Sequence, residues 1–417
     1  MDKIIEKDSK NFLFGKILFT LFYLSLFIGF YFGEDSSGSG GFIADFNNTW
    51  GYIIALQEKQ FVLPSEWVLH TPLHFLIISK FYPFFESKVL LRIFFCSLGF
   101  LVPLIFYNCL KLKFPNIKKS TLLIFASSIF LFPSFRSGVI WANDHVTALI
   151  FFLIFSYFFL KWENNKTSLK LALYQCFFLS LAVYSRQYYA LIFFYCLFVY
   201  FSNFDLKEFI KICFFIFLLT IPGFFLIYYD PILISTTFDN NLSNTILVSS
   251  SILSFYLLPF YFLKVMSFNK NKIIEKNLIF IFFFSLVLVI ILLGFFDYNY
   301  KTGGGFFIKL SYLIFNNEYL FIISSIFGIT FLLLLIKENK INSILIIIML
   351  IGFPAYMIFQ KYYEPFFIFV LFLLLKTNIT QSIFYSNRNL LLYYSYIFLY
   401  LISAIINDQL NLTKTLL

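Results

Sequence analysis

Long apolar runs separated by short polar hinges fill most of the chain. Several runs reach the length of about 20 residues that a helix needs to cross a bilayer, and the others fall slightly short of it. The pattern therefore predicts an all-α fold, a polytopic bundle of about thirteen transmembrane helices. The predicted helix cores are Phe12–Phe32, Val89–Cys109, Thr121–Phe135, Val146–Leu160, Leu169–Ser185, Tyr188–Phe201, Ile212–Tyr229, Ile246–Leu263, Leu278–Phe296, Tyr319–Ile336, Ile344–Phe359, Phe366–Leu375 and Leu390–Ile406.

The first run is followed by the longest polar segment of the chain, residues 33–87. It begins with a stretch rich in Gly and Ser, and two amphipathic, aromatic-rich stretches follow, Phe46–Gln60 and Val68–Phe81. We expect these two to be helices lying at the membrane interface. The first run lacks a small-residue cleavage site, so we expect a retained helix and not a cleaved signal peptide. The whole chain, residues 1–417, is then one membrane domain.

Composition supports a membrane protein. Hydrophobic residues make up 60% of the 417 positions and charged residues only 12%, and the mean hydropathy is +0.86. A soluble domain carries roughly 25% charged residues, so this chain has too little polar surface to cover a water-soluble core. A lipid bilayer tolerates such an apolar exterior.

Charge indicates the orientation. The chain has 31 Lys and Arg against 21 Asp and Glu, and the basic residues are dispersed between the apolar runs. No basic cluster with exposed aromatic residues suggests nucleic-acid binding. With a cytoplasmic N-terminus, each inner loop is basic, as the positive-inside rule expects. The membrane would be the plasma (inner) membrane in a bacterium and the endoplasmic reticulum in a eukaryote.

Asp45 is the first candidate for chemistry, because it stands among Gly and aromatic residues near a membrane boundary. A carboxylate there is costly unless it is solvated or paired. It could act as the general base that takes a proton from a hydroxyl. Glu34 and Asp35 are less specific competitors. The alternative is that Asp45 only caps the predicted helix Phe46–Gln60.

His70 and His74 are spaced four residues apart, so a helix would place both on one face. The pair could recognise phosphate or bind a metal ion, but no third ligand stands at a metalloprotease spacing. Pro72 between them indicates that a helix starts here. We interpret the segment as interfacial packing with one functional histidine.

Asn143, Asp144 and His145 fall in the short outer loop after the third predicted helix. Together they could bind hydroxyl groups, a phosphate or a divalent cation. The equally weighted alternative is that Asn143 or Asp144 merely caps the next helix.

Arg186 and Gln187 interrupt an otherwise apolar passage. Arg186 could snorkel to the interface as a structural residue, or it could face the bundle and bind a phosphate or a carboxylate. Lys361 and Tyr362 form a similar short outer loop, in which they would either bind a lipid phosphate or anchor the chain at the interface. All of these candidates map to the same side of the membrane, which suits an enzyme with a lipid-phosphate donor.

The order of these motifs resembles the GT-C superfamily of membrane glycosyltransferases. Within it, the chain is most similar to the family of dolichyl-phosphate-glucose glucosyltransferases that add the last glucose to the lipid-linked oligosaccharide. The resemblance covers about the first half of the chain, and the acidic pair of that family's first loop is reduced here to Asp45 followed by Phe46. The matching segments are Asp45, His70-Thr71-Pro72-Leu73-His74, Phe132-Pro133, Asn143-Asp144, Asn165-Lys166-Thr167-Ser168 and Arg186-Gln187.

The resemblance implies an inverting sugar transfer from a polyprenyl-phosphate donor to a lipid-linked glycan or another acceptor, with no cofactor required and a divalent cation optional. Asp45 and Asp144 would be the catalytic acids, and Arg186 and Lys361 would steady the departing phosphate. A flippase or another transporter of lipid-linked saccharides is one alternative, although the apolar runs carry few midplane polar residues. A polymerase or ligase of the O-antigen type is the other, although its large outer loop would lie in the second half.

Overall fold

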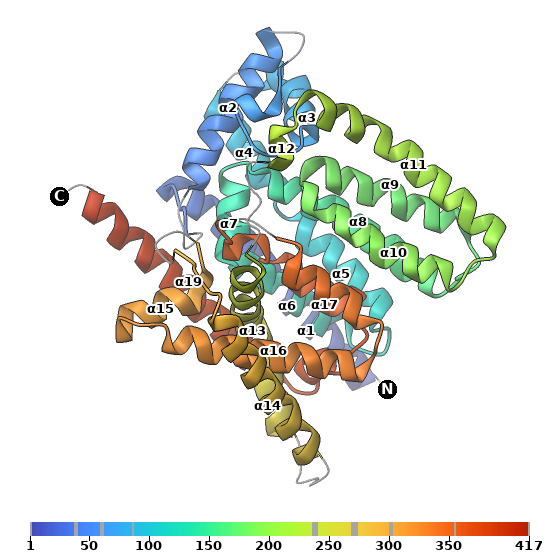
Figure 1. Cartoon of the computed structure of the whole chain (residues 1–417), viewed down its shortest axis with the longest axis vertical. Coiled ribbons are helices and arrows are strands. Elements are labelled where there is room, and N and C mark those ends of the chain that lie inside the picture. Colours follow the sequence, from blue (N-terminus) through green and yellow to red (C-terminus); the bar gives the residue numbers. More distant parts are fainter. Residues whose placement is uncertain are drawn as a thin grey trace. The chain divides into compact units, whose positions relative to one another are not determined.

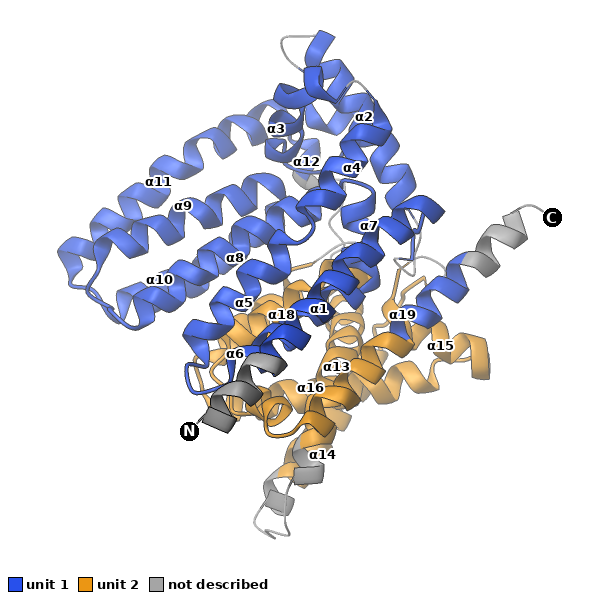
Figure 2. Cartoon of the chain, turned by 180° about the vertical axis from the view of Figure 1, so that it is seen from behind, with its two compact units in different colours: residues 1–236, 400–417 blue, residues 237–399 orange. Residues whose placement is uncertain are grey.

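The computed structural model describes residues 2–36, 41–58, 62–85, 87–235, 241–267, 274–299, 303–353 and 356–415. Within these ranges the chain is helical, with short 3-10 turns and no strand, so the all-α prediction is confirmed. The chain divides into two compact units, residues 1–236 with 400–417 (unit 1) and residues 237–399 (unit 2), which Figure 2 shows in different colours. The Gly/Ser-rich residues 37–40 and the predicted helix end at Gln60 lie outside the described ranges.

Seven described helices are long and apolar enough to cross a membrane, and the chain is therefore a multi-pass membrane protein. A bent pair of helices makes an eighth span if the two halves count as one, and five further apolar helices have 10 to 17 residues. The number thirteen stays a prediction. The seven spans are Asn11–Phe32, Lys88–Lys113, Asp144–Glu163, Leu206–Tyr229, Leu242–Leu263, Tyr319–Glu338 and Asn387–Asp408.

Unit 1 contains the first twelve helices. In it α8 packs against α9 and α5, α11 runs along α9, α1 lies along α6, and α2 lies against α3 (Figure 1). Ser168 caps α9 and Asp205 caps α11, each accepting a backbone N–H from the first turn. The helices are α1 (Asp2–Phe32), α2 (Phe42–Glu58), α3 (Leu73–Phe81), α4 (Lys88–Leu98), α5 (Leu101–Lys113), α6 (Lys119–Ser127), α7 (Pro133–Ile140), α8 (Asp144–Glu163), α9 (Leu169–Ser185), α10 (Ile192–Phe201), α11 (Leu206–Tyr229) and α12 (Ile232–Ser235).

The predicted span Thr121–Phe135 is not one straight helix. The chain breaks at Phe132, and α6 with its 3-10 extension meets α7 at an angle of 69°. Pro133 explains the break, because proline lacks the N–H of a helix interior and fits the first position of the next helix.

The helices of residues 33–87 differ from the prediction in their boundaries. The helix predicted at Phe46–Gln60 begins four residues earlier, after Gly41, whose φ of 100° suits glycine. Asp45 therefore lies within the first turn of α2, and the alternative that it caps this helix is wrong. The helix predicted at Val68–Phe81 is confirmed only from Leu73, directly after Pro72.

Unit 2 is built on α13, which packs against α15, α16 and α17. Gly328 lets α13 and α16 approach closely, since a β-carbon there would lie 2.0 Å from the carbonyl oxygen of Ser250. The predicted span Phe366–Leu375 consists of one α-helical and one π-helical turn, whose side chains are all buried within the protein. The helices are α13 (Leu242–Ser267), α14 (Ile274–Leu293), α15 (Gly305–Phe315), α16 (Tyr319–Glu338), α17 (Asn342–Ile351), α18 (Phe366–Phe369) and α19 (Asn387–Thr415), the last of which continues into residues of unit 1.

Candidate functional site

A buried ion pair joins two helix ends in unit 1. Arg186 follows the last residue of α9 in an extended conformation, and Asp144 is the first residue of α8. Nη2 of Arg186 lies 2.6 Å from Oδ1 of Asp144, and both side chains are 3% exposed. A cation at a helix C-terminus and an anion at a helix N-terminus are each favoured by the helix dipole. The predicted break at Arg186–Gln187 is confirmed, and Arg186 faces the bundle.

Two further predicted residues touch the same guanidinium. Its Nη2 also donates to Oδ1 of Asn143 at 3.3 Å, and its Nη1 lies 3.3 Å from Nδ1 of His70. Asn143 is also the cap of α8, because its side chain accepts the N–H of His145. The capping alternative is thus confirmed for Asn143, and capping does not exclude the contact with Arg186. His70 is only half-buried and is the most accessible of these partners.

One oxygen of the pair is left over. Oδ2 of Asp144 is buried and has no hydrogen-bond partner among the described residues. A buried carboxylate oxygen without a partner costs about 1 to 3 kcal/mol or more. Such a group in a native fold calls for an explanation, and a ligand that supplies the missing donor is one.

His145 and Gln187 line the same region. Nδ1 of His145 lies 3.2 Å from the hydroxyl of Tyr188, and Gln187 donates to the carbonyl oxygen of Leu69 at 3.1 Å. The segment beside His70 is also tied to α9, because Thr71 donates to a carbonyl oxygen of that helix. These bonds hold the three chain segments of the site together.

His74 is placed differently from its neighbours. It is 1% exposed, and both of its ring nitrogens bond within the chain, Nε2 to the carbonyl oxygen of Ala142 at 3.1 Å and Nδ1 to the hydroxyl of Thr147 at 2.8 Å. Burial, with a smaller contribution from the nearby Arg186, lowers the pKa of His74 to about 3. His74 is therefore a neutral imidazole that holds the turn before α8, where Ala142 has a φ of 47°.

Asp45 and the second-half residues are not joined to the pair by these contacts. Asp45 is half-buried, and the adjacent Phe46 packs against Trp141, with 5.9 Å between ring centroids. Lys361 and Tyr362 belong to unit 2, where the Lys361 ammonium lies 5.3 Å from an aromatic ring and Tyr362 stacks on Phe353. That all of these residues lie on the same side of the membrane as Arg186 stays a prediction.

The described residues hold no group of three or more His, Cys, Asp or Glu that could bind a metal ion. Among the described residues, the fold therefore brings no third His, Cys, Asp or Glu ligand to His70 and His74. The predicted divalent cation has only Asp144 among these side chains as an anionic ligand.

Sequence reasoning missed a second buried ion pair, between Arg136 and Glu34. Nε and Nη2 of Arg136 each lie 2.7 Å from one oxygen of Glu34, and the side chains are 6% and 9% exposed. The remaining N–H groups donate to the hydroxyl and carbonyl oxygens of Ser25 and to the carbonyl oxygen of Phe130. The available signal was an arginine directly after an apolar run, which needs a partner.

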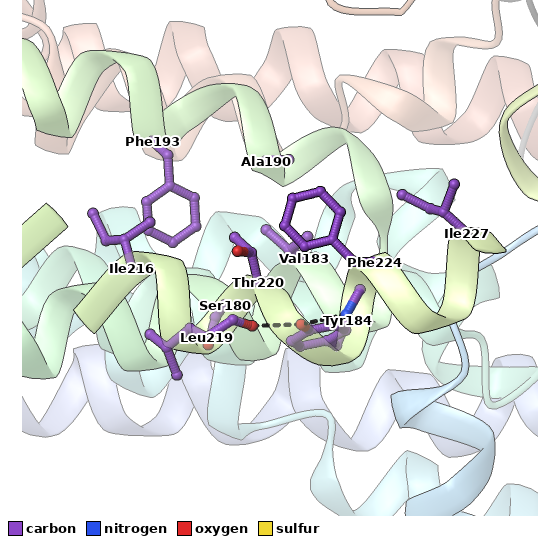
Figure 3. Close-up of a pocket in the computed structure, with 11 residues that line it drawn as sticks. Ser180, Val183, Tyr184, Ala190, Phe193, Ile216, Leu219, Thr220, Phe224 and Ile227 are labelled. Atoms are coloured by element: carbon purple, nitrogen blue, oxygen red, sulfur yellow. Dashed lines mark hydrogen bonds between the residues drawn. The ribbon is translucent and has the colours of Figure 1, made fainter. Parts of the chain in front are cut away.

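An open apolar groove of about 220 Å³ lies between α9, α10 and α11 (Figure 3). In its lining, the hydroxyl of Tyr184 joins α9 to α11, because it donates to the carbonyl oxygen of Leu219 and accepts the N–H of Gly223 beside the helix proline Pro222. None of the candidate residues lines it, so the groove is not the charged site. Its lining consists of Ser180, Val183, Tyr184, Ala190, Phe193, Ile216, Leu219, Thr220, Gly223, Phe224 and Ile227.

No protein-family model, curated protein or solved structure matches the chain.

Proposed function

We propose that this membrane protein is a glycosyltransferase that moves a sugar from a polyprenyl-phosphate donor to a lipid-linked glycan or another hydroxyl acceptor on the non-cytoplasmic face. The observation that carries the proposal is the Arg186–Asp144 pair, which is buried but leaves Oδ2 of Asp144 without a partner among the described residues. Buried ion pairs that serve stability alone usually have their remaining oxygens satisfied.

Arg186 would bind the donor phosphate. A guanidinium is the preferred partner of phosphate oxygens, because its planar N–H groups match their geometry. The contact with His70 is 3.3 Å, long for a hydrogen bond, and His70 is half-buried. A phosphate oxygen can therefore replace the imidazole at Nη1 while Asp144 keeps hold of Nη2. The N-terminus of α8 adds a favourable dipole for an anion.

The reaction needs two acidic groups in different roles. The acceptor oxygen attacks the anomeric carbon, the bond from that carbon to the phosphate oxygen breaks, and the acceptor proton goes to the carboxylate of Asp45. Polyprenyl phosphate leaves with one more negative charge, which Arg186 stabilises. Asp144 orients Arg186, and its Oδ2 accepts a hydroxyl group of the donor sugar.

The other predicted residues take supporting roles in this proposal. His70 and Asn143 border the phosphate position, and His145 and Gln187 hold the walls of the site. His74 acts on the turn before α8 and not on the donor, because both of its ring nitrogens are engaged. The binding of a lipid phosphate by Lys361 and Tyr362 stays a prediction.

The test is transfer from a panel of polyprenyl-phosphate sugars by the purified protein in lipid nanodiscs. Asp45→Asn should lower turnover by about 10² to 10⁴ with donor binding kept, because only the proton acceptor is lost. Arg186→Gln should raise the donor KM by about 10- to 100-fold, the equivalent of one charge-assisted contact. Thr220→Val, which changes the lining of the groove and loses a hydrogen bond within α11, is the control and should transfer like the wild type.

Two results would contradict the proposal. One is the absence of transfer from every donor by folded wild-type protein. The other is full transfer by both Asp45→Asn and Arg186→Gln. If Asp45→Asn alone kept full activity, the general base would be a different acid.

A further inference from the structure

The turn that presents Asp144 lies between the two buried ion pairs of unit 1. Arg136 stands on α7, three residues of turn follow that helix, and Asp144 opens α8. Ala142 in this turn has the left-handed φ of 47°, which residues with a β-carbon rarely adopt. Such a backbone persists only where the surroundings hold it, so contacts must hold this turn, while Asp144 beyond it is held directly by Arg186.

Trp141 ties the turn to the start of the outer loop. Its indole Nε1 donates to the carbonyl oxygen of Glu34 at 2.9 Å. The guanidinium of Arg92 lies 3.6 Å from the Trp141 ring, and its Nε donates to the carbonyl oxygen of Ile140 at 2.9 Å. The cation–π contact and the indole hydrogen bond both favour the observed orientation of Trp141.

Glu34 is itself immobilised. Both of its oxygens accept from Arg136, and all five N–H groups of that guanidinium have an acceptor. Gly29 makes room for the pair, because a β-carbon there would lie 2.3 Å from Oε2 of Glu34. The carbonyl group of Glu34, which accepts the hydrogen bond of Trp141, is therefore held in place.

The residue after Glu34 also holds the start of α2. Asp35, the next residue, accepts the backbone N–H of Ile43 through Oδ2 at 3.2 Å, which holds the start of that helix. Phe46, also on α2, packs against the Trp141 ring. Asp45 lies between these two anchor points.

We propose that Glu34, Arg136 and Trp141 form a positioning frame. This frame holds Asp45 at a fixed position relative to the Arg186–Asp144 pair. This inference rests on the proposed function, in which Asp45 takes the proton of the acceptor and Arg186 binds the phosphate of the donor. The frame residues touch neither substrate and act through the residues that they place. Displacement of Asp45 lowers turnover but leaves donor affinity unchanged, because the Arg186–Asp144 pair that binds the donor stays intact.

Trp141→Phe is the test, since it deletes one hydrogen bond and keeps the ring for stacking. Misplacement of a reacting group by about 1 Å costs up to about 100-fold in rate, so turnover should fall about 10- to 100-fold with unchanged donor affinity. In an Asp45→Asn background the same substitution should have no further effect on turnover. Trp162→Phe is the matched control, because Trp162 is fully buried on α8 and its Nε1 has no partner among the described residues.

A distance measurement tests the frame without any activity. Spin labels at Asn48→Cys on α2 and Lys161→Cys on α8 occupy exposed positions, and Cys213→Ser removes the one cysteine that is not buried. The interlabel distance distribution should be narrow in the wild type and in Trp162→Phe, and broader or shifted in Trp141→Phe. If no donor supported transfer but this change occurred, the frame would stand while the proposed function failed. An unchanged distribution in Trp141→Phe would overturn the frame.

Discussion

Unit 1 contains two buried arginine–carboxylate pairs of the same chemistry, Arg136 with Glu34 and Arg186 with Asp144, and they differ in how completely they are satisfied. The first is bidentate, and every N–H of its guanidinium meets an acceptor. Glu34 also accepts the hydroxyl of Ser36. The second makes one short contact, and one carboxylate oxygen has no partner among the described residues.

The difference separates a structural pair from a candidate binding pair. A charge pair pays for its removal from water only when its geometry is good and its other lone pairs and protons are satisfied. Arg136–Glu34 meets that condition and can only hold the chain. Arg186–Asp144 does not, and its partner His70 is half-buried, so we propose that a ligand reaches the pair beside His70. Burial and charge alone would have ranked the two pairs as equals.

The largest effect on stability should come from breaking the satisfied pair. Glu34→Gln keeps the size of the side chain but leaves the Arg136 charge buried without a counter-charge, so the free energy of unfolding should fall by about 3 to 5 kcal/mol. Denaturant unfolding of the purified protein in detergent measures it. The matched control is Glu163→Gln, whose partner Lys113 lies 3.7 Å away with both side chains at least 20% exposed.

Loss of that exposed pair should cost less than about 1 kcal/mol. If Glu34→Gln and Glu163→Gln unfolded at the same denaturant concentration, the Arg136–Glu34 pair would not be the structural anchor that its geometry indicates.

A smaller effect should appear with pH, through His74. Its pKa is about 3 in the folded chain against the ordinary value of 6.5, so below pH 6.5 the unfolded chain binds a proton that the folded chain does not. The contribution of His74 to stability is complete above pH 6.5 and falls by about 1.4 kcal/mol per pH unit as the pH drops toward 3. Between pH 7.5 and 5.5 the wild type should lose about 1.4 kcal/mol more than His74→Gln. Parallel losses in the two proteins would show that His74 is not the buried neutral group described here.

The local features of the site could be predicted from the sequence. Arg186 is marked by its charge within an apolar run, and α9 does end before it. The Asn143–His145 segment is marked by three polar residues between two apolar runs. Both signals depend only on neighbouring residues and on the cost of charge in lipid. The break at Pro133 had a local signal as well, but the hydrophobicity of the run outweighed it.

The pairings could not be predicted in this way. Arg186 meets a histidine 116 positions earlier, and Arg136 meets a glutamate 102 positions earlier. Which of several outer-face acids and bases pair depends on how the helix ends come together, and no periodicity encodes that. The contacts of His74 could not be predicted for the same reason, because its two partners lie on the turn and on α8, far along the chain.

The most direct test of the open pair is the binding of polyprenyl phosphate itself, without sugar or acceptor. The double variant Asp144→Asn/Arg186→Gln removes both charges and keeps amides that can hydrogen bond, so its stability should stay close to that of the wild type. The account predicts that it binds polyprenyl phosphate in nanodiscs about 10- to 100-fold more weakly than the wild type. Wild-type affinity in the folded double variant would contradict the claim that the Arg186–Asp144 pair is the donor site.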